Sequence, residues 1–142
     1  MKISDVMTRD VETIAPDQTV REAASFMVSA DTGSIPVTDG DKLIGMITDR
    51  DIAVRGIAKG YGPETLVRDL MTDDVVAVHH DENVADVAAK MGEAQVRRMP
   101  VIDGDQKLCG IVSLGDLSRQ AEGDAASEVL SGVSQKGGAH QQ

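Results

Sequence analysis

Two short stretches of this sequence place a hydroxyl side chain three residues before a carboxylate. Thr48 precedes Asp51 in GMITDRDI, and Ser113 precedes Asp116 in GIVSLGDL. In both stretches an apolar run ends at the hydroxyl and another begins at the carboxylate, so we expect a strand-to-helix corner. The first turn of a helix offers unpaired N–H groups to a phosphate, and an ionised carboxylate can accept both hydroxyls of a ribose. The two corners are therefore candidates for binding a nucleotide.

The same spacing also has a purely structural interpretation. Ser or Thr followed three residues later by an acid is a capping box, which satisfies free N–H groups at the start of a helix. Such a cap contributes about 1 kcal/mol to stability and needs no ligand. For a single T-x-x-D the cap is the more frequent explanation, so both interpretations stay open at this stage.

The duplication of the motif is part of an internal repeat. Two pairs of segments share an offset of 64 residues. They are VMTRDVETIAPDQTV (6–20) with LMTDDVVAVHHDENV (70–84), and SIPVTDGD (34–41) with RMPVIDGD (98–105). One inserted residue in the DGDQK turn raises the offset to 65, which aligns Gly110 with Gly45 and Asp116 with Asp51. The two corners thus occupy equivalent positions.

Each repeat predicts the element order β-α-β-β-α. Short strands at 11–14 and 75–78 precede helices that Thr19 and Asn83 cap, running to about residues 30 and 94. Hairpins follow, with strands at 35–38 and 43–48 in the first repeat around the turn DGDK. A second helix is expected from about Asp49 to just before Gly60.

The fold class expected from this pattern is α/β, of the α+β type. A unit of about 60 residues buries little surface alone, so we expect the two sheets to pack together with pseudo-twofold symmetry. The predicted organisation is repeat 1 at 1–59, a linker at 60–67, repeat 2 at 68–121 and a flexible tail at 122–142.

Composition excludes several functions. The formal net charge of −10 argues against nucleic acid, and no apolar run is long enough to span a bilayer. Phe26 and Tyr61 are the only aromatic residues, so the core is expected to be aliphatic. The start of the chain lacks a secretory signal pattern, and the single Cys109 fits a buried thiol in a reducing cytoplasm.

The ordered set of motifs resembles a tandem pair of CBS domains, also called a Bateman module. The resemblance covers about residues 2–119 and rests on the MT openings, the segments IPV and MPV, and the endings GMITDRDI and GIVSLGDL. The stretches TDRDIAVRGIA and QVRRMPV resemble small stand-alone bacterial CBS pairs of the hypoxic response protein type.

This resemblance implies binding of an adenosine compound, such as AMP, ADP, ATP, NAD or S-adenosylmethionine, in a cleft between the repeats. It assigns the ribose to Asp51 and Asp116, and phosphate contacts to Thr48 and Ser113. Adenine contacts fall on two sets of residues. These are Thr13, Ile14, Ile35 and Pro36 at one site, and Val78, His79, Met99 and Pro100 at the other.

The two repeats differ in charge beside these positions. Arg97 and Arg98 precede Met99, whereas the equivalent residues of the first repeat are Gly33 and Ser34. We therefore expect the second site to bind phosphate better, with ion pairing to the many acidic residues as the alternative role for the arginines.

No metal site or catalytic constellation is predicted. His79 and His80 are adjacent on a strand and point to opposite faces, which does not suit a shared metal. Asp49, Arg50, Arg55 and Lys59 are expected on a solvated helix face. The resemblance implies a cytoplasmic regulatory sensor that is not an enzyme and requires no cofactor. It is expected to form a homodimer and to signal through an unidentified protein effector or through its own oligomer. The alternative is a ligand-free interaction or stress module whose corners are only helix caps.

Overall fold

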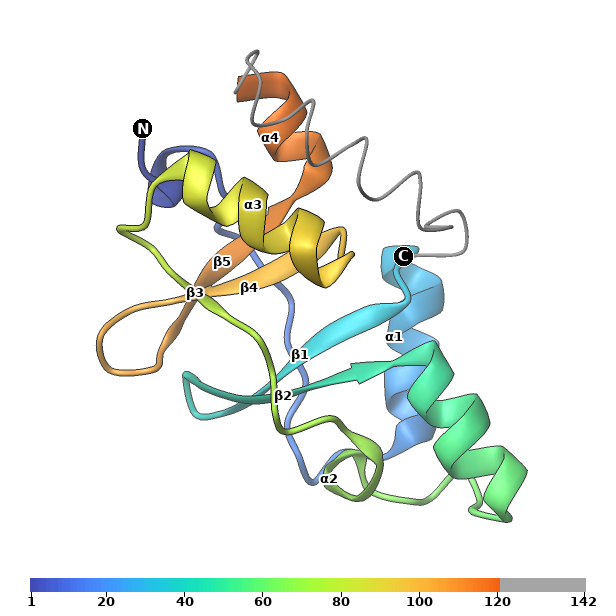
Figure 1. The fold of residues 1–142 in the computed structure, drawn as a ribbon. Coiled ribbons are helices and arrows are strands. Elements are labelled where there is room, and N and C mark those ends of the chain that lie inside the picture. Colours follow the sequence, from blue (N-terminus) through green and yellow to red (C-terminus); the bar gives the residue numbers. More distant parts are fainter. Residues whose placement is uncertain (121–142) are drawn as a thin grey trace. The chain divides into compact units, whose positions relative to one another are not determined.

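Two eleven-residue helices begin at the capping residues that the sequence indicates. The computed structural model describes residues 1–120, and the expected tail at 122–142 lies outside them. Helix α1 (Val20–Ala30) starts after Thr19, whose side chain accepts from the Glu22 amide, while Glu22 accepts from the Thr19 amide at 3.1 Å. Helix α3 (Val84–Ala94) starts after Asn83, which accepts from the Ala85 amide at 2.9 Å. Both predicted helices are confirmed (Figure 1).

Both predicted hairpins are present. Strands β1 (Ser34–Asp39) and β2 (Lys42–Thr48) pair antiparallel, as do β4 (Arg98–Ile102) and β5 (Leu108–Ser113). Each hairpin has a register irregularity at the same place in β1 and β4, after Val37 and after Val101. The repeat in the sequence is thus a repeat in backbone geometry.

The first strand of each repeat is shorter than predicted. Instead of a strand at 11–14, only Ile14 forms a bridge, parallel to Val37 of β1. Instead of 75–78, strand β3 is Val78–His79 and pairs parallel with β4. The boundaries between the two compact units, Val11/Glu12 and Val75/Val76, fall inside the two predicted strands.

The second helix of the first repeat has the predicted extent but an irregular form. A wide π-helical turn, η2 (Asp51–Gly56), continues into a 3₁₀ turn, η3 (Ile57–Lys59). A Cβ on Gly56 would lie 2.7 Å from Cδ1 of Leu70, so this turn passes directly over that side chain. In the second repeat, helix α4 spans Leu114–Gln120.

The compact units of the structure differ from the repeats of the sequence. One unit spans Glu12–Val75, and the other combines Met1–Val11 with the described chain from Val76 to Gln120. The predicted linker at 60–67 therefore lies inside the first of these units, where the Val67 amide donates to the Gln18 carbonyl at 2.8 Å. In each unit the segment that opens one repeat packs on the hairpin of the other.

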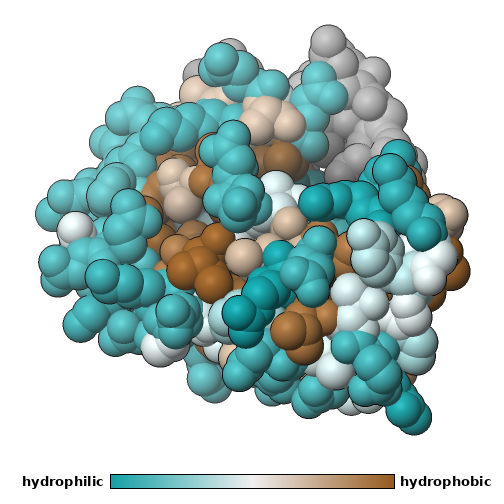
Figure 2. All heavy atoms as spheres, turned by 90° about the horizontal axis from the view of Figure 1, so that it is seen from below, coloured by the Kyte–Doolittle hydropathy of each residue, from teal (hydrophilic) through white to brown (hydrophobic). Residues whose placement is uncertain are grey.

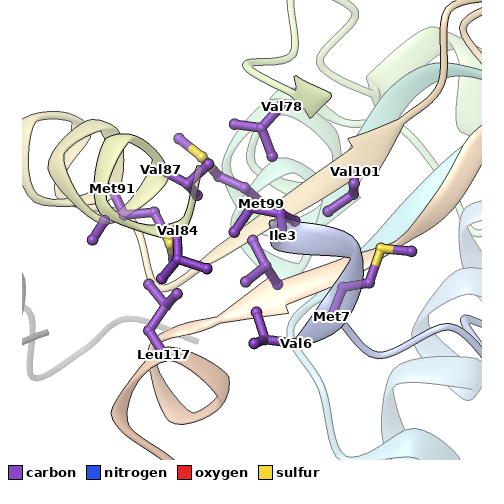
Figure 3. Close-up of a cluster of buried hydrophobic side chains, with 12 residues drawn as sticks. Ile3, Val6, Met7, Val78, Val84, Val87, Met91, Met99, Val101 and Leu117 are labelled. Carbon is purple, nitrogen blue, oxygen red and sulfur yellow. The ribbon is translucent and has the colours of Figure 1, made fainter. Parts of the chain in front are cut away.

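Each unit has its own aliphatic core. In the unit Glu12–Val75, the short helix α2 (Val67–Leu70) adds its apolar side chains to those of α1 and the β1–β2 hairpin. In the other unit, the 3₁₀ turn η1 (Ile3–Asp5) and Met7 fill the equivalent place beneath α3 and the β4–β5 hairpin. Figure 3 shows Ile3, Val6 and Met7 pointing toward Met99 and Val101 in this core.

Two glycines allow the opening segments to approach the hairpins closely. The Thr72 backbone exchanges two hydrogen bonds with Met46 beside Gly45, and a Cβ on Gly45 would lie 2.8 Å from the Thr72 carbonyl oxygen. The Thr8 backbone does the same with Ile111 beside Gly110, where a Cβ would lie 2.5 Å from the Thr8 carbonyl oxygen. Each MT opening is therefore held as a strap across the strand of the other repeat.

We expect Gly45→Ala and Gly110→Ala each to lower the free energy of unfolding by about 1–3 kcal/mol, because the added methyl meets backbone that cannot move without losing the strap. Chemical denaturation measures this. Gly62→Ala is the matched control, since nothing lies within 4 Å of a Cβ there. Unchanged stability in both strap variants would contradict the close approach.

Candidate functional site

The two hydroxyl–carboxylate corners adopt the same reciprocal geometry. The Thr48 amide donates to Oδ2 of Asp51 at 3.0 Å, and the Asp51 amide donates to Oγ1 of Thr48 at 3.0 Å. The Ser113 amide donates to Oδ2 of Asp116 at 3.0 Å, and the Asp116 amide donates to Oγ of Ser113 at 3.1 Å. Both motifs are therefore complete capping boxes in the absence of any ligand.

Burial distinguishes these acids from ordinary caps. Asp51 is only 8% exposed and Asp116 only 4%, whereas carboxylates are rarely buried because removing their charge from water is costly. The cap does not use all the capacity of the motif, because a hydroxyl that accepts one bond still has a hydrogen to donate. An ionised carboxylate likewise offers about four acceptor positions on its two oxygens. The corner can serve as a cap and still bind a polar ligand.

The corner of the unit Glu12–Val75 lies where β1 starts and β2 ends. Ser34 pairs with Thr48 across the hairpin, and the Asp49 amide donates to the Gly33 carbonyl at 2.9 Å. Ile14 joins β1 alongside, with its amide donating to Pro36 and its carbonyl accepting from Thr38.

The side chains predicted for adenine at this corner are mostly inside the core. Ile14 and Ile35 are 2% and 1% exposed, and Pro36 is buried as well. Thr13 alone of this set is partly exposed. In this conformation the aliphatic members of the set can meet a ligand only after local rearrangement, and their contribution stays a prediction.

The corner of the other unit carries the two arginines. Arg98 pairs with Ser113 across the β4–β5 hairpin, and the Leu114 amide donates to the Arg97 carbonyl at 3.0 Å. Arg98 is exposed, whereas Arg97 is partly buried and its Nε has no hydrogen-bond partner within the described residues. The register therefore places the backbone of both arginines beside Ser113 and Leu114, and Ser113 is the residue predicted to contact phosphate.

The adenine set of this corner is also largely buried. Val78 and Met99 are 0% and 1% exposed and belong to the core, and Pro100 is buried. His79 is exposed, and its amide donates to Oε2 of Glu82 at 2.8 Å. Burial of Glu82 would raise its pKa, but the ammonium of Lys90 at 2.6 Å and the His79 amide outweigh it, so the pKa lies below the usual value.

Other titratable groups have structural causes for their shifts. Backbone N–H groups of Lys107 and Asp105 hold the pKa of Asp103 below its usual value in the β4–β5 turn. Partial burial raises the pKa of the Cys109 thiol, which keeps it protonated and unreactive. Among residues 1–120, no three His, Cys, Asp or Glu side chains are grouped to hold a metal ion.

Sequence reasoning missed two contacts of Asp51. Arg55 Nη1 lies 3.6 Å from Oδ1 of Asp51 and donates to the Met71 carbonyl at 3.2 Å. The Thr72 hydroxyl donates to the same Oδ1 at 3.5 Å. Arg55 lies on an exposed face, as the sequence predicts, and it also pairs with Asp51. The spacing of four residues from Asp51 was the signal available, since such pairs share a helix face.

An apolar hollow of about 460 Å³ lies in the unit Glu12–Val75, between α1 and the η2–η3 turns. Seven residues line it: Ala24, Met27, Val28, Asp49, Ile52, Ala53 and Ile57. Val28 is 82% exposed and Ile57 is 59% exposed, which is unusual for large aliphatic side chains. Apolar patches also interrupt the hydrophilic surface in Figure 2.

The repeats and their corners are those of a known class of ligand-binding module. The family model of the CBS domain matches residues 3–55 and 67–123. The chain belongs to the CBS-domain family and carries two copies of the domain. None of the helices within residues 1–120 has the length and apolar character needed to cross a membrane.

Curated relatives match nearly the whole chain. The CBS domain-containing protein YhcV of Bacillus subtilis is 39% identical over 133 residues, covering 93% of this chain and 94% of YhcV. Hypoxic response protein 1 of Mycobacterium tuberculosis is 37% identical over 117 residues, covering 81% of each chain. The resemblance to hypoxic response proteins that the sequence indicates is thus confirmed.

Solved structures share the fold. Hypoxic Response Protein I with two coordinated zinc ions has a TM-score of 0.76 at 34% identity, covering 84% of this chain and 98% of that one. CBSX2 in complex with AMP has a TM-score of 0.75 at 31% identity, covering 85% and 96%. The CBS domain pair of MJ0100, in complex with 5′-methylthioadenosine and S-adenosyl-L-methionine, has a TM-score of 0.71 at 30% identity, covering 84% and 94%. The predicted α+β class is confirmed.

Two substitutions of Asp116 distinguish its role as an acceptor in the helix cap from the role of its negative charge. Asp116→Asn keeps an oxygen for the Ser113 amide, so we expect near wild-type stability. Asp116→Ala leaves that amide without its acceptor and should lower the free energy of unfolding by about 0.5–2 kcal/mol. Denaturant unfolding without ligand measures both, and equal stability of the Ala variant and wild type would show that the cap contributes nothing.

Proposed function

We propose that this protein is an adenine-nucleotide-binding regulatory module and not an enzyme. It binds AMP, ADP, ATP or NAD-type ligands at its two corners and passes the signal to a partner protein or to its own oligomer. The observation that carries the proposal is the duplicated, buried hydroxyl–carboxylate corner in a chain of the CBS family. The AMP complex of CBSX2 and the S-adenosylmethionine complex of MJ0100 support adenosine compounds as the ligand class.

The proposed roles follow the chemistry of each group. Asp51 and Asp116 accept the ribose hydroxyls, and Thr48 and Ser113 donate to phosphate with the hydrogens that capping leaves unused. At the second corner, Arg97 is the stronger candidate for a phosphate contact. Its Nε is buried and has no hydrogen-bond partner among residues 1–120, and such a group gains most from an anion.

The adenine contacts proposed from the family resemblance require local rearrangement. Thr13 and His79 offer partly or fully exposed side chains, whereas Ile14, Ile35, Val78 and Met99 lie in the two cores. We therefore propose that adenine is held by the backbone of the segments at Thr13 and His79 more than by the aliphatic side chains. The zinc ions of the Hypoxic Response Protein I structure have no counterpart cluster among residues 1–120 here.

The alternative function is a ligand-free interaction module. The complete capping boxes favour it, because they explain both motifs without a nucleotide. The two functions differ in a simple measurement. A ligand at about one hundred times its Kd stabilises the folded state by about 2.7 kcal/mol, whereas a module without a nucleotide site shows no shift.

We expect AMP to raise the melting temperature of the wild-type protein. Calorimetry should show that Asp116→Asn weakens AMP binding by about 1–3 kcal/mol, since a charged acceptor for the ribose is lost. Arg97→Gln should weaken AMP more than adenosine, because adenosine has no phosphate. Arg21→Gln is the control for charge, as Arg21 is exposed at the start of α1 and belongs to neither corner. Absence of any shift with millimolar AMP, ADP, ATP or NAD would favour the alternative function.

We further propose that the protein is a homodimer in which the apolar hollow between α1 and the η2–η3 turns is covered by a second copy. A mass near twice the monomer's 15.0 kDa is expected by sedimentation at micromolar protein. Val28→Glu should shift the mass toward the monomer, because it buries a charge at the contact. The control Val76→Glu, at an exposed valine away from the hollow, should stay dimeric. A monomeric wild type would end this proposal.

A further inference from the structure

The carboxylate of Asp51 has two different oxygens. Oδ2 accepts the short capping bond from the Thr48 amide at 3.0 Å. Oδ1 has only long contacts, with Arg55 Nη1 at 3.6 Å and the Thr72 hydroxyl at 3.5 Å. Both exceed the 2.7–3.2 Å typical of strong hydrogen bonds, so Oδ1 is held loosely. A ligand hydroxyl can therefore donate to Oδ1 without breaking the capping bond to Oδ2.

Arg55 forms the outer cover of this oxygen. Its side chain is 49% exposed, whereas that of Asp51 is 11% exposed. The same Nη1 also donates to the Met71 carbonyl at 3.2 Å, which fixes the guanidinium between the carboxylate and the MT strap. A ligand that approaches Oδ1 from solvent therefore meets Arg55 first, and it must displace this ion pair or share the oxygen with it.

We propose that Arg55 is a latch that competes with ribose hydroxyls for Asp51 at the first corner. The proposal rests on the proposed function, since it names what limits ligand entry at one of its sites. Ligand binding at Asp51 releases the guanidinium from Oδ1 and from the Met71 carbonyl together. Occupancy of the first corner therefore loosens the strap at Met71–Thr72.

The first corner is isolated by working in Asp116→Asn, and the probes are adenosine and 2′,3′-dideoxyadenosine. In this background we expect Arg55→Gln to tighten adenosine binding about two- to fivefold, the size expected when a partly exposed ion pair no longer competes. Dideoxyadenosine lacks the competing hydroxyls, so its affinity should not improve. Arg50→Gln removes the same charge from an exposed neighbouring residue and should change neither affinity.

Hydrogen exchange gives a readout that does not depend on affinity. The Thr72 amide donates to the Met46 carbonyl in the strap. We expect this amide to exchange faster in Arg55→Gln without ligand, and faster in the wild type when adenosine is added. Arg50→Gln should exchange like the wild type.

The outcomes separate the latch from the proposed function. If Arg55→Gln weakens adenosine binding or leaves it unchanged, Arg55 is a ligand contact or a bystander, and the latch is wrong while nucleotide binding stands. If Arg55→Gln improves both nucleosides equally, the competition is not for the ribose hydroxyls, and the latch is also wrong. If the otherwise unmodified chain and all variants bind no nucleoside or nucleotide, the proposed function fails and the latch fails with it.

Discussion

The close approach of backbone to backbone at Gly45 and Gly110 is the constraint on which the rest of the structure depends. At both glycines the space that a Cβ would fill is taken by a threonine carbonyl and a methionine side chain of an MT segment. The paired bonds of Thr72 with Met46 and of Thr8 with Ile111 require this contact. The same segments carry Val67 and Leu70 into the core beneath α1, and Ile3 and Val6 into the core beneath α3.

This constraint explains why one repeat is not a complete unit. A hairpin and one amphipathic helix leave an apolar surface open, and the opening segment of the other repeat covers it in both units. Because the repeats exchange equivalent segments, both cores are built from the same kinds of element. Each core also contains residues from both repeats. The aliphatic composition suits this arrangement, since Val, Ile and Met side chains fill irregular space between short elements without needing polar partners.

Much of the fold could be predicted because its signals are local. The caps at Thr19 and Asn83 and the hairpin turns each depend on residues within a few positions, and the structure has them where the sequence places them. The exchange of opening segments could not be predicted, because a match between two repeats does not say which copy of a motif packs on which hairpin. The strands expected at 11–14 and 75–78 were too long for the same reason: the chain passes between units there.

The two corners likewise combine features that the sequence predicts with features that it does not. The spacing of Thr48 with Asp51 and of Ser113 with Asp116 predicts their reciprocal bonds, because these are local. Their burial depends on contacts distant in sequence, such as that between Asp51 and Thr72, and no motif encodes it. The burial of Ile14 and Ile35 likewise comes from core packing, which the family pattern of ligand contacts does not reveal.

The contact between Asp51 and Thr72 gives the exchanged architecture a functional meaning. Thr72 opens the second repeat in sequence, yet its hydroxyl and the neighbouring Met71 carbonyl border the carboxylate of the first repeat. The segment that borders this carboxylate continues past Val75 into the rest of the second repeat. In a protein whose repeats each completed their own core, the acid of one repeat would have no direct contact with the other. Here the same strap that completes the core also borders the corner, so the stability of the fold and the state of the corner depend on one segment.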